Sequence, residues 1–498
     1  MVLKGRYSLT IDVGTSVSKV TLYDEAFREV SKAKDEITTN YPQPLFFEQD
    51  PNQWWTNIRR EIKEVTSRAD LKEIKAIGVC AQMHAPILVD RKGIVLFPSL
   101  SWPDLRTVET TDEISSKTGI SQPYYTALAP KILWIKRSNS SMIDRTYKFL
   151  LPKDFVRMKL SNTFCTDLND ANGTSMFDDG RREWIKTLVD YLGISIDQLP
   201  EVRRPEEIVG GITQEAAKET GLLEGTPVIT GSSDNLGRSL DRAAASARDL
   251  LIYLGSGAMI EYISETGARP KGTYRSILGI AGTVPQWFKN NFGAEDRIKA
   301  EKLGIDALQL LDSEAEELEP GAGGLLFLPH IMGERAYEGR TRSDPSNFNP
   351  YARGVVYGLC LGHTRKHVFR AILEGCVYQL YLSWERIQSL NPGIVANRIV
   401  ASGGGSKSRV WRQIIADTFD LPVCLPKETE TGSLAIACLI SVADGASKTF
   451  DEAVARIKNP LLDPVQPNKQ NWPKYQQAFG LYKRLEADLK DMFTPHPG

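Results

Sequence analysis

A repeated pattern of strand, glycine turn and strand constrains the fold of this chain more than any other feature of its sequence. Residues 7–23 form two runs of alternating and β-branched residues around Gly14-Thr15-Ser16, as expected of two strands joined by a tight turn. Residues 250–263 repeat the pattern around Gly255-Ser256-Gly257. The turns begin at positions 14 and 255, an offset of 241 residues in a chain of 498. An offset of this size predicts a duplicated domain and not a solenoid.

Helical and strand-like segments alternate around the two turns. Apolar spacing predicts helices over residues 54–65, 363–390, 409–419 and 475–489, strands over residues 74–80, 227–230 and 398–402, and a hairpin over residues 86–97. Mixed helices and strands in both halves predict an α/β fold. We expect a boundary near the middle, which gives domains of residues 1–246 and 247–498.

Composition excludes several other classes of protein. The 61 basic and 62 acidic side chains nearly cancel, so no global basic field for nucleic acid exists. The longest strongly apolar run, residues 434–443, has ten residues, against the ~20 that a membrane-spanning helix needs. The six cysteines form no CxxC pair, which predicts reduced, mostly buried thiols and a cytoplasmic protein.

Three glycine-rich turns are candidates for binding phosphate or nucleotide. The two hairpin turns expose backbone N–H groups with little side-chain obstruction. Gly403-Gly404-Gly405-Ser406 follows a predicted strand and opens a predicted helix, a place where a nucleotide can bind. Each turn taken alone can equally serve backbone geometry only. The sequence lacks the G-x-x-x-x-G-K-[ST], H-R-D, D-F-G and G-x-G-x-x-G motifs, so a nucleotide site here is of another kind.

Three polar residues near these turns have both a structural and a functional interpretation. Asp12 precedes the first turn and either bonds to turn amides or holds Mg²⁺ through water. Asp234 ends a loop before a helix, and pattern alone favours a helix N-cap. His84 lies at the end of a predicted strand, where a satisfied structural histidine is the alternative to a ligand contact.

Together these motifs resemble the FGGY family of carbohydrate kinases. The resemblance extends from about residue 7 to residue 440. Its most specific part is residues 354–374, where the family's C-terminal signature matches Gly354, Gly358, Leu359, His367, Val368, Ala371 and Glu374. Within the family the chain is most similar to the xylulokinases, in residues 48–55, 82–84, 102–106, 130–134, 151–154, 234–235, 326–329, 333–335 and 411–413.

The resemblance implies a fold and a set of site residues. The implied fold is actin/Hsp70/hexokinase-like, with two ribonuclease H-like domains flanking a central cleft. The first domain would carry the sugar site and the first phosphate turn. The second would carry the second phosphate turn, the adenosine site and the C-terminal helix. The implied residues are Asp12 for the metal; Gly14, Thr15, Ser16, Gly255, Ser256 and Gly257 for phosphates; Gly403, Gly404, Gly405 and Ser406 for adenosine; and Met83, His84, Asp234 and Asn235 for the sugar.

The implied reaction is transfer of the γ-phosphate of ATP, with Mg²⁺, to a sugar hydroxyl, with D-xylulose the first candidate acceptor. Asp234 would be the general base, with an ordinary carboxyl pKa near ~4. Another ketose, a polyol or an open-chain sugar derivative remains an alternative substrate, and an actin-like ATPase without a sugar substrate a remote one. The expected partners are small molecules, with no nucleic acid and no membrane, and a homodimer stays open.

Two residues beside the implied sugar site depart from the xylulokinase pattern. Ala85 stands where those kinases usually have glycine, and Leu236 where they usually have alanine. One methyl-sized change in a pocket shifts selectivity by roughly 1–3 kcal/mol. We therefore expect Ala85 and Leu236 to narrow the sugar pocket.

Overall fold

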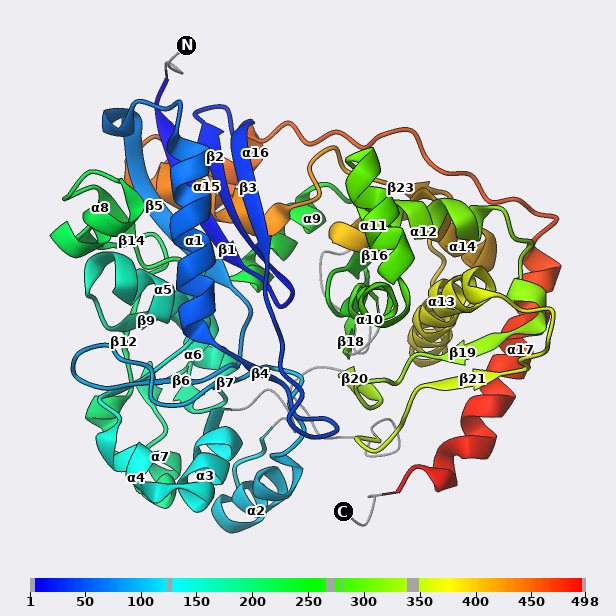
Figure 1. Ribbon diagram of the computed structural model, residues 1–498, viewed down its shortest axis with the longest axis horizontal. Helices are drawn as coiled ribbons and strands as arrows, with labels where there is room; N and C mark the ends of the chain where they lie inside the picture. Colours follow the sequence, from blue (N-terminus) through cyan, green and yellow to red (C-terminus); the bar gives the residue numbers. More distant parts are fainter. Residues whose placement is uncertain (1–4, 123–127, 266–273, 279–280, 338–348, 495–498) are drawn as a thin grey trace. The chain divides into compact units, whose positions relative to one another are not determined.

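The computed structural model divides into two compact units, each built around its own β-sheet (Figure 1). It describes residues 5–122, 128–265, 274–278, 281–337 and 349–494. The first unit comprises Met1–Leu240 and Thr431–Lys458, and the second comprises Asp241–Glu430 and Asn459–Gly498. The chain therefore enters the first unit twice.

The sheet of the first unit combines an antiparallel meander with parallel strands. Strands β1, β2 and β3 are consecutive and antiparallel, whereas β5 runs parallel to β1 on its other side. The order is β13-β14-β5-β1-β2-β3, with β15 also paired to β5. The strands are β1 (Tyr7–Val13), β2 (Val17–Asp24), β3 (Glu29–Glu36), β5 (Ile74–Ala81), β13 (Ile208–Gly211), β14 (Pro227–Ile229) and β15 (Ser232–Ser233).

Helices cover both faces of this sheet (Figure 1). Ile77 and Val79 of β5 join the core under α1 (Pro51–Thr66) and α5 (Pro152–Ser161). Ala76 and Cys80 point to the opposite face and pack against α15 (Thr431–Ala443). Successive side chains of a strand point to opposite faces of the sheet. Because β5 is apolar on both faces, elements must pack against each of them. The C-terminal segment supplies the second of these elements.

A mostly helical layer is inserted within the first unit. Its core lies around Ile114, Leu128, Ile132 and Leu188. Its elements and the remaining ones of this unit are β4 (Glu48–Gln49), η1 (Leu71–Glu73), β6 (Ile87–Val89), β7 (Ser99–Leu100), α2 (Val108–Thr118), α3 (Leu128–Ser138), α4 (Ser140–Arg145), β8 (Lys148–Leu150), β9 (Cys165–Asp167), α6 (Leu168–Gly173), β10 (Phe177–Asp178), β11 (Glu183–Trp184), α7 (Lys186–Leu192), η2 (Ile196–Gln198), β12 (Glu201–Arg203), α8 (Gln214–Thr220), η3 (Asp234–Gly237) and α16 (Phe450–Arg456).

The second unit repeats the sheet plan of the first. Strands β16, β17 and β18 form an antiparallel meander, and β22 runs parallel to β16. The order is β20-β18-β17-β16-β22-β23, and a helix precedes β22 as α1 precedes β5. The strands are β16 (Asp249–Leu254), β17 (Ala258–Tyr262), β18 (Tyr274–Leu278), β20 (Arg335–Tyr337), β22 (Arg398–Ser402) and β23 (Val423–Cys424). This shared topology confirms the repeat predicted from the two glycine turns.

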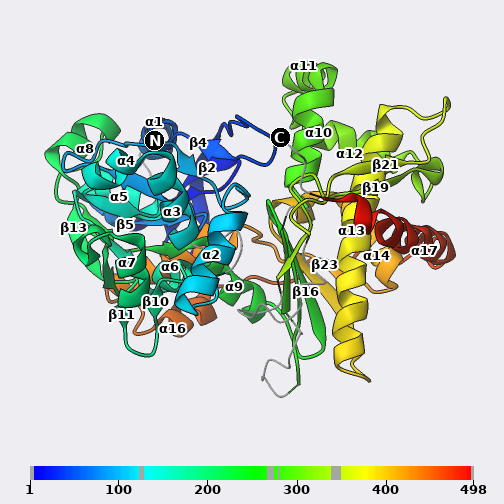
Figure 2. The ribbon, with the colours of Figure 1, turned by 90° about the horizontal axis from the view of Figure 1, so that it is seen from below.

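The long helix α13 (Arg365–Leu390) lies between the second sheet and α17 (Trp472–Leu489) (Figure 2). Its buried side chains, among them Phe369, Ile372 and Trp384, form a core with Leu250 and Ile252 of β16. The other elements of this unit are α9 (Arg238–Ala243), which begins at its border, α10 (Thr283–Phe292), α11 (Ala294–Leu303), α12 (Ala307–Glu316), η4 (Ala322–Gly324), β19 (Leu326–Leu328), β21 (Val355–Tyr357), η6 (Gly404–Lys407), α14 (Arg409–Phe419) and η7 (Lys490–Met492).

Two expectations are met in part, and the domain division differs. Residues 86–97 turn back around Asp90 as expected, since Val89 bridges Val95 and Leu96 N donates to Leu88 O at 2.8 Å. The pairing is limited to that one bridge, and β6 forms its strand ladder with β8. The compact units also depart from a simple division at 246/247, because α15 packs on β5. Five cysteines are buried as expected, but Cys360 is exposed.

No helix in the described ranges combines the length and apolarity needed to cross a bilayer.

Glu61 of α1 gives a testable pH dependence of stability. Burial raises the pKa of Glu61 from 4.5 to about 8, although Ser18 Oγ donates a hydrogen bond of 2.5 Å to Oε1. A raised pKa stabilises the folded protein fully below pH 4.5, and this contribution is lost as the pH rises toward 8. Glu61→Gln should therefore raise the free energy of unfolding by about 1–3 kcal/mol at pH 8.5 and change it little near pH 4.5. Thermal unfolding at both pH values checks this, and an equal effect at both would contradict it.

Candidate active site

The first glycine turn is held in shape by contacts from outside the hairpin. Gly14 N donates to Val17 O at 3.0 Å and closes the turn. Gln49 Nε2 donates to the Thr15 carbonyl at 2.7 Å, and Trp102 Nε1 donates to Thr15 Oγ1 at 2.8 Å. The Thr15 hydroxyl accepts from Trp102, so its own proton is available to an acceptor such as a phosphate oxygen.

Two carboxylates meet at the carboxyl ends of neighbouring strands. Asp12 of β1 is in register with Cys80 of β5, and Ser232 of β15 is in register with the same cysteine from the other side. Asp234 follows two residues after Ser232, at the first position of η3. Ligand sites in open α/β sheets commonly form at such strand ends.

Asp234 has an altered acidity in this arrangement. Desolvation by the surrounding protein, followed by the charge of Asp12, raises the pKa of the Asp234 carboxyl from 3.8 to about 7. The residue still keeps an exposed surface toward solvent, so a ligand can reach it. The expected pKa near ~4 was therefore wrong, because the desolvation of Asp234 and the nearby charge of Asp12 both arise only in the folded chain. The favoured helix N-cap assignment was also wrong: Ser233 occupies that position.

The donor set around Asp12 fits a divalent cation. The charge of Asp12 adds to the rise in the pKa of Asp234 that burial causes, and a bound cation would offset the repulsion between the two carboxylates. Mg²⁺ binds through few carboxylates and several waters, which suits a site with only two. In the described part of the chain, no group of three or more histidine, cysteine or acidic side chains could hold a metal. Lys19 Nζ lies 3.6 Å from Asp12 Oδ2 and provides a resident positive charge.

Met83, His84 and Asn235 lie together beside these carboxylates. Asn235 Nδ2 is 2.7 Å from Met83 Sδ. His84 has a left-handed backbone with φ of 66°, a rare conformation for a residue other than glycine that often marks a functional position. The buried Lys131 fixes it, since Lys131 Nζ donates to the His84 carbonyl at 2.6 Å.

His84 is a neutral hydrogen-bonding group at physiological pH. Burial and the positive charge of Lys131 lower the pKa of His84 from 6.5 to about 3. Gly173 lies against the ring, because a Cβ added there would be 3.1 Å from His84 Cε1. A neutral imidazole carries one donor and one acceptor nitrogen, which suits a polyhydroxylated ligand.

Ala85 does not narrow this site as expected. Ala85 is completely buried, so its methyl group reaches no ligand. Leu236 packs against the α15 core but is only partly buried. The expected narrowing by Ala85 was therefore wrong, and the expected narrowing by Leu236 stays a prediction.

The second unit brings two glycine loops into contact. Gly403, with φ of 82°, lies so close to the end of β16 that an added Cβ would be 2.7 Å from Leu254 O and 3.1 Å from Gly255 N. A backbone hydrogen bond fixes the loop at Gly255: Gly282 N donates to Gly255 O at 2.8 Å. Close backbone approach explains glycine at position 403, and it places residues 255–257 beside residues 403–406.

Ser406 differs from its expected place beside adenosine. Its side chain is fully buried, and its hydroxyl donates to Gly403 O at 2.6 Å. It therefore shapes the loop from inside. Gly404, in contrast, is exposed, and an added Cβ there would meet no atom within 4 Å. Of the two, only Gly404 offers an open face to a ligand.

These two glycines provide a matched pair of variants. Gly404→Ala should raise the KM for ATP by about tenfold or more at unchanged stability, because the methyl group enters only the space of the ligand. Gly403→Ala should instead lower the melting temperature, because its methyl group meets backbone. ATP titrations and thermal unfolding of both variants measure the two effects. An unchanged KM for ATP in Gly404→Ala would remove this loop from the nucleotide site.

The N-terminus of α15 is a site element that the sequence analysis missed. An added Cβ at Gly432 would lie 3.9 Å from Asp12 Oδ2, and one at Gly237 would lie 2.7 Å from Gly432 N. The start of α15 therefore borders both Asp12 and the turn that carries Asp234. Thr431-Gly432-Ser433 before a long apolar run is a helix-start signal, so the helix could have been found, but its location could not.

Family models match both units. The N-terminal domain model of the FGGY family of carbohydrate kinases matches residues 7–239, and the C-terminal domain model of the same family matches residues 257–443. The chain therefore belongs to the FGGY family of carbohydrate kinases. The topology described above is the two-domain actin/hexokinase-like fold of that family.

Individual relatives carry two different substrate names. A xylulose kinase of Escherichia coli is 30% identical over 96% of this chain and 98% of its own length. A gluconokinase of Bacillus subtilis is 28% identical over 98% of this chain and 97% of its own length. The structure of a ligand-bound xylulose kinase from Lactobacillus acidophilus superposes with a TM-score of 0.74 at 24% identity, over 98% of this chain and 99% of that one.

Proposed function

We propose that this chain transfers the γ-phosphate of ATP to a hydroxyl of a small sugar, with D-xylulose the first candidate and D-xylulose 5-phosphate the product. The observation that carries the proposal is Asp234, an exposed carboxylate with a pKa raised to about 7 beside Asp12 and within the same unit as the neutral His84. A general base works best when its pKa lies near the working pH. We place the reaction in the cytoplasm.

In this proposal Asp234 accepts the proton of the attacking hydroxyl. Phosphoryl transfer through a loose transition state needs little deprotonation of the nucleophile until late. Met83, His84 and Asn235 orient the sugar by contact and hydrogen bonding. Positioning of this kind contributes a large share of the rate because it removes the entropy cost of a bimolecular encounter.

The remaining site residues serve the nucleotide. Gly14 closes the first turn, and Thr15 and Ser16 offer their backbone N–H groups and hydroxyls to phosphate oxygens. Gly255 closes the second turn in the same way, and Ser256 and Gly257 offer their backbone N–H groups. The exposed face of Gly404 borders the adenosine, with Gly403, Gly405 and Ser406 supporting it from below. Asp12 would hold Mg²⁺ through water. When bound, the ion neutralises charge on the transferred phosphate.

Gluconate is the second candidate substrate, since the Bacillus subtilis gluconokinase is nearly as similar as the xylulose kinase and is covered to the same extent. Both candidates are open-chain or readily opened polyhydroxylated molecules, so neutral hydrogen-bonding groups such as His84 suit either.

A coupled ADP-release assay tests the proposal across a panel of acceptors. The panel comprises D-xylulose, other pentuloses and hexuloses, gluconate, polyols and glycerol, each at saturating ATP and Mg²⁺. We expect the highest kcat/KM with D-xylulose. A preference for gluconate would establish the second candidate, and sugar-independent ATP turnover with every acceptor would contradict a sugar kinase. Sedimentation of the active protein would decide whether it is the homodimer that the sequence leaves open.

A further inference from the structure

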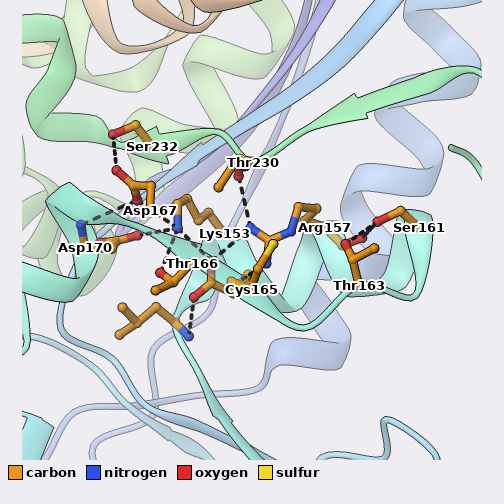
Figure 3. A network of polar contacts seen from close by, with 12 residues as sticks. Lys153, Arg157, Ser161, Thr163, Cys165, Thr166, Asp167, Asp170, Thr230 and Ser232 are labelled. Atoms are coloured by element: carbon orange, nitrogen blue, oxygen red, sulfur yellow. Dashed lines mark hydrogen bonds and ion pairs between the residues drawn. The ribbon is translucent and has the colours of Figure 1, made fainter. Parts of the chain in front are cut away.

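A fully buried cluster of charged side chains joins α5 and the start of α6 in the first unit (Figure 3). We call it the Lys153 cluster; its members are Lys153, Asp154, Arg157, Asp167 and Asp170, each no more than 3% exposed. The ammonium nitrogen of Lys153 lies 2.6 Å from a carboxylate oxygen of Asp154 and 3.0 Å from one each of Asp167 and Asp170. None of these side chains takes part in the proposed chemistry.

The cluster holds three carboxylates against two cations, the side chains of Lys153 and Arg157. Burial raises the pKa of the Asp170 carboxyl, with Lys153 opposing and Asp167 adding to the rise. A buried ion cluster rarely stabilises a fold more than apolar side chains of the same volume would, and its best-attested use is to specify one geometry.

The segment that leads into Asp234 is fixed to this cluster at two points. Arg157 Nη1 donates to the Thr230 carbonyl at 3.0 Å, and Ser232 Oγ donates to Asp167 Oδ2 at 2.8 Å (Figure 3). Between them, Gly231 has φ of 75°, and an added Cβ would overlap the carbonyl group of Val79. The backbone is therefore held on both sides of Gly231, its tightest point, which lies three residues before Asp234.

The same cluster supports the residues on the sugar side. Asp167 is the N-cap of α6: its carboxylate accepts from Asn169 N at 3.0 Å and from Asp170 N at 3.4 Å. Gly173, at the other end of this short helix, lies against the Met83 side chain and the His84 ring, since an added Cβ would overlap the Met83 methyl group and lie 3.1 Å from His84 Cε1. A shift of Asp167 would therefore move the support of both the base and the sugar-binding residues.

We infer that the Lys153 cluster sets the position of Asp234 relative to His84, and that Asp167, acting through the Ser232 hydroxyl, is a positioning residue for phosphoryl transfer. The inference rests on the proposed function of Asp234. The inference adds a structural connection between the base and the sugar-binding residues. Asp167 is connected to the Asp234 segment through the Ser232 hydroxyl and to His84 through α6. Misplacement of a reacting group by about 1 Å can cost 10²-fold in rate.

The pair Ser232→Ala and Ser161→Ala separates positioning from simple loss of a buried hydrogen bond. Ser161 lies at the far end of the same network, where its hydroxyl donates to Arg157 O at 2.9 Å (Figure 3). We expect Ser232→Ala to lower kcat roughly tenfold with the KM for ATP within about twofold. Ser161→Ala should leave both constants within about twofold, with a loss of melting temperature similar to that of Ser232→Ala. Equal kcat values for the two variants would overturn the inference.

A double-mutant cycle and a parallel base variant complete the test. If Ser232 acts through Asp167, the double variant that combines Asp167→Asn and Ser232→Ala should have nearly the kcat of the single variant Asp167→Asn. A double variant whose loss of kcat equals the product of the two single losses would contradict the connection. Asp234→Asn is measured alongside. An active Asp234→Asn enzyme would overturn the proposed role of Asp234 and this inference with it. An inactive Asp234→Asn with Ser232→Ala equal to Ser161→Ala would overturn the inference alone.

Discussion

Asp234→Asn is expected to lower kcat for sugar phosphorylation by about 10²- to 10⁴-fold, the range that a general base contributes. The substitution keeps the shape of the side chain and removes its ability to accept a proton. It also removes a negative charge beside Asp12, whose repulsion contributes to the raised pKa of Asp234. ATP binding should therefore be kept or slightly strengthened. Steady-state kinetics with ATP and sugar varied separately give both quantities.

A surface carboxylate provides the control for this variant. Asp190 forms an exposed ion pair with Lys186 in α7, at 2.9 Å, and pairs of this kind contribute little. Asp190→Asn should keep the wild-type kcat. An Asp234→Asn enzyme with more than about a tenth of the wild-type kcat would show that Asp234 is not the base.

Lys153→Met should lower the free energy of unfolding by about 3–5 kcal/mol, the cost of removing one partner from a buried ion cluster. The methionine fills much of the volume of the lysine but leaves three carboxylates without their common cation. Two of these, Asp154 and Asp167, lie within 2.6 and 3.0 Å of the lost ammonium group. Urea unfolding followed by circular dichroism measures the change.

The matched control is Lys186→Met, which removes an exposed lysine from its pair with Asp190. This change should cost less than about 1 kcal/mol. Similar unfolding midpoints for Lys153→Met and Lys186→Met would mean that the Lys153 cluster does not depend on its central cation.

Local patterns were enough to predict much of the fold. The helix expected over residues 409–419 coincides with α14, and the strand over residues 398–402 coincides with β22, because apolar periodicity and flanking glycines are properties of short segments. The place of α15 in the first unit was not predictable in this way. Its sequence shows only that it is apolar on all sides, and its partner, β5, lies more than 350 positions earlier in the chain.

The candidate site was predictable where backbone geometry dictates the residue type. Gly403 is required by a positive φ and by contact with the end of β16, and a run of glycines after a strand signals such a need. Burial and charge are properties of the folded chain. The neutral state of His84 and the raised pKa of Asp234 depend on neighbours distant in sequence, so the sequence could name these residues but not their states.

The most direct test of the account is to identify the product of the complete reaction. The purified protein is incubated with ATP, Mg²⁺ and D-xylulose, or with gluconate in a parallel reaction, and the mixture is analysed by phosphorus NMR and mass spectrometry. We expect one phosphorylated sugar formed per ADP, and formation of that product at least about 100-fold more slowly with Asp234→Asn. Release of free phosphate at the same rate with and without sugar, and no sugar phosphate, would contradict it.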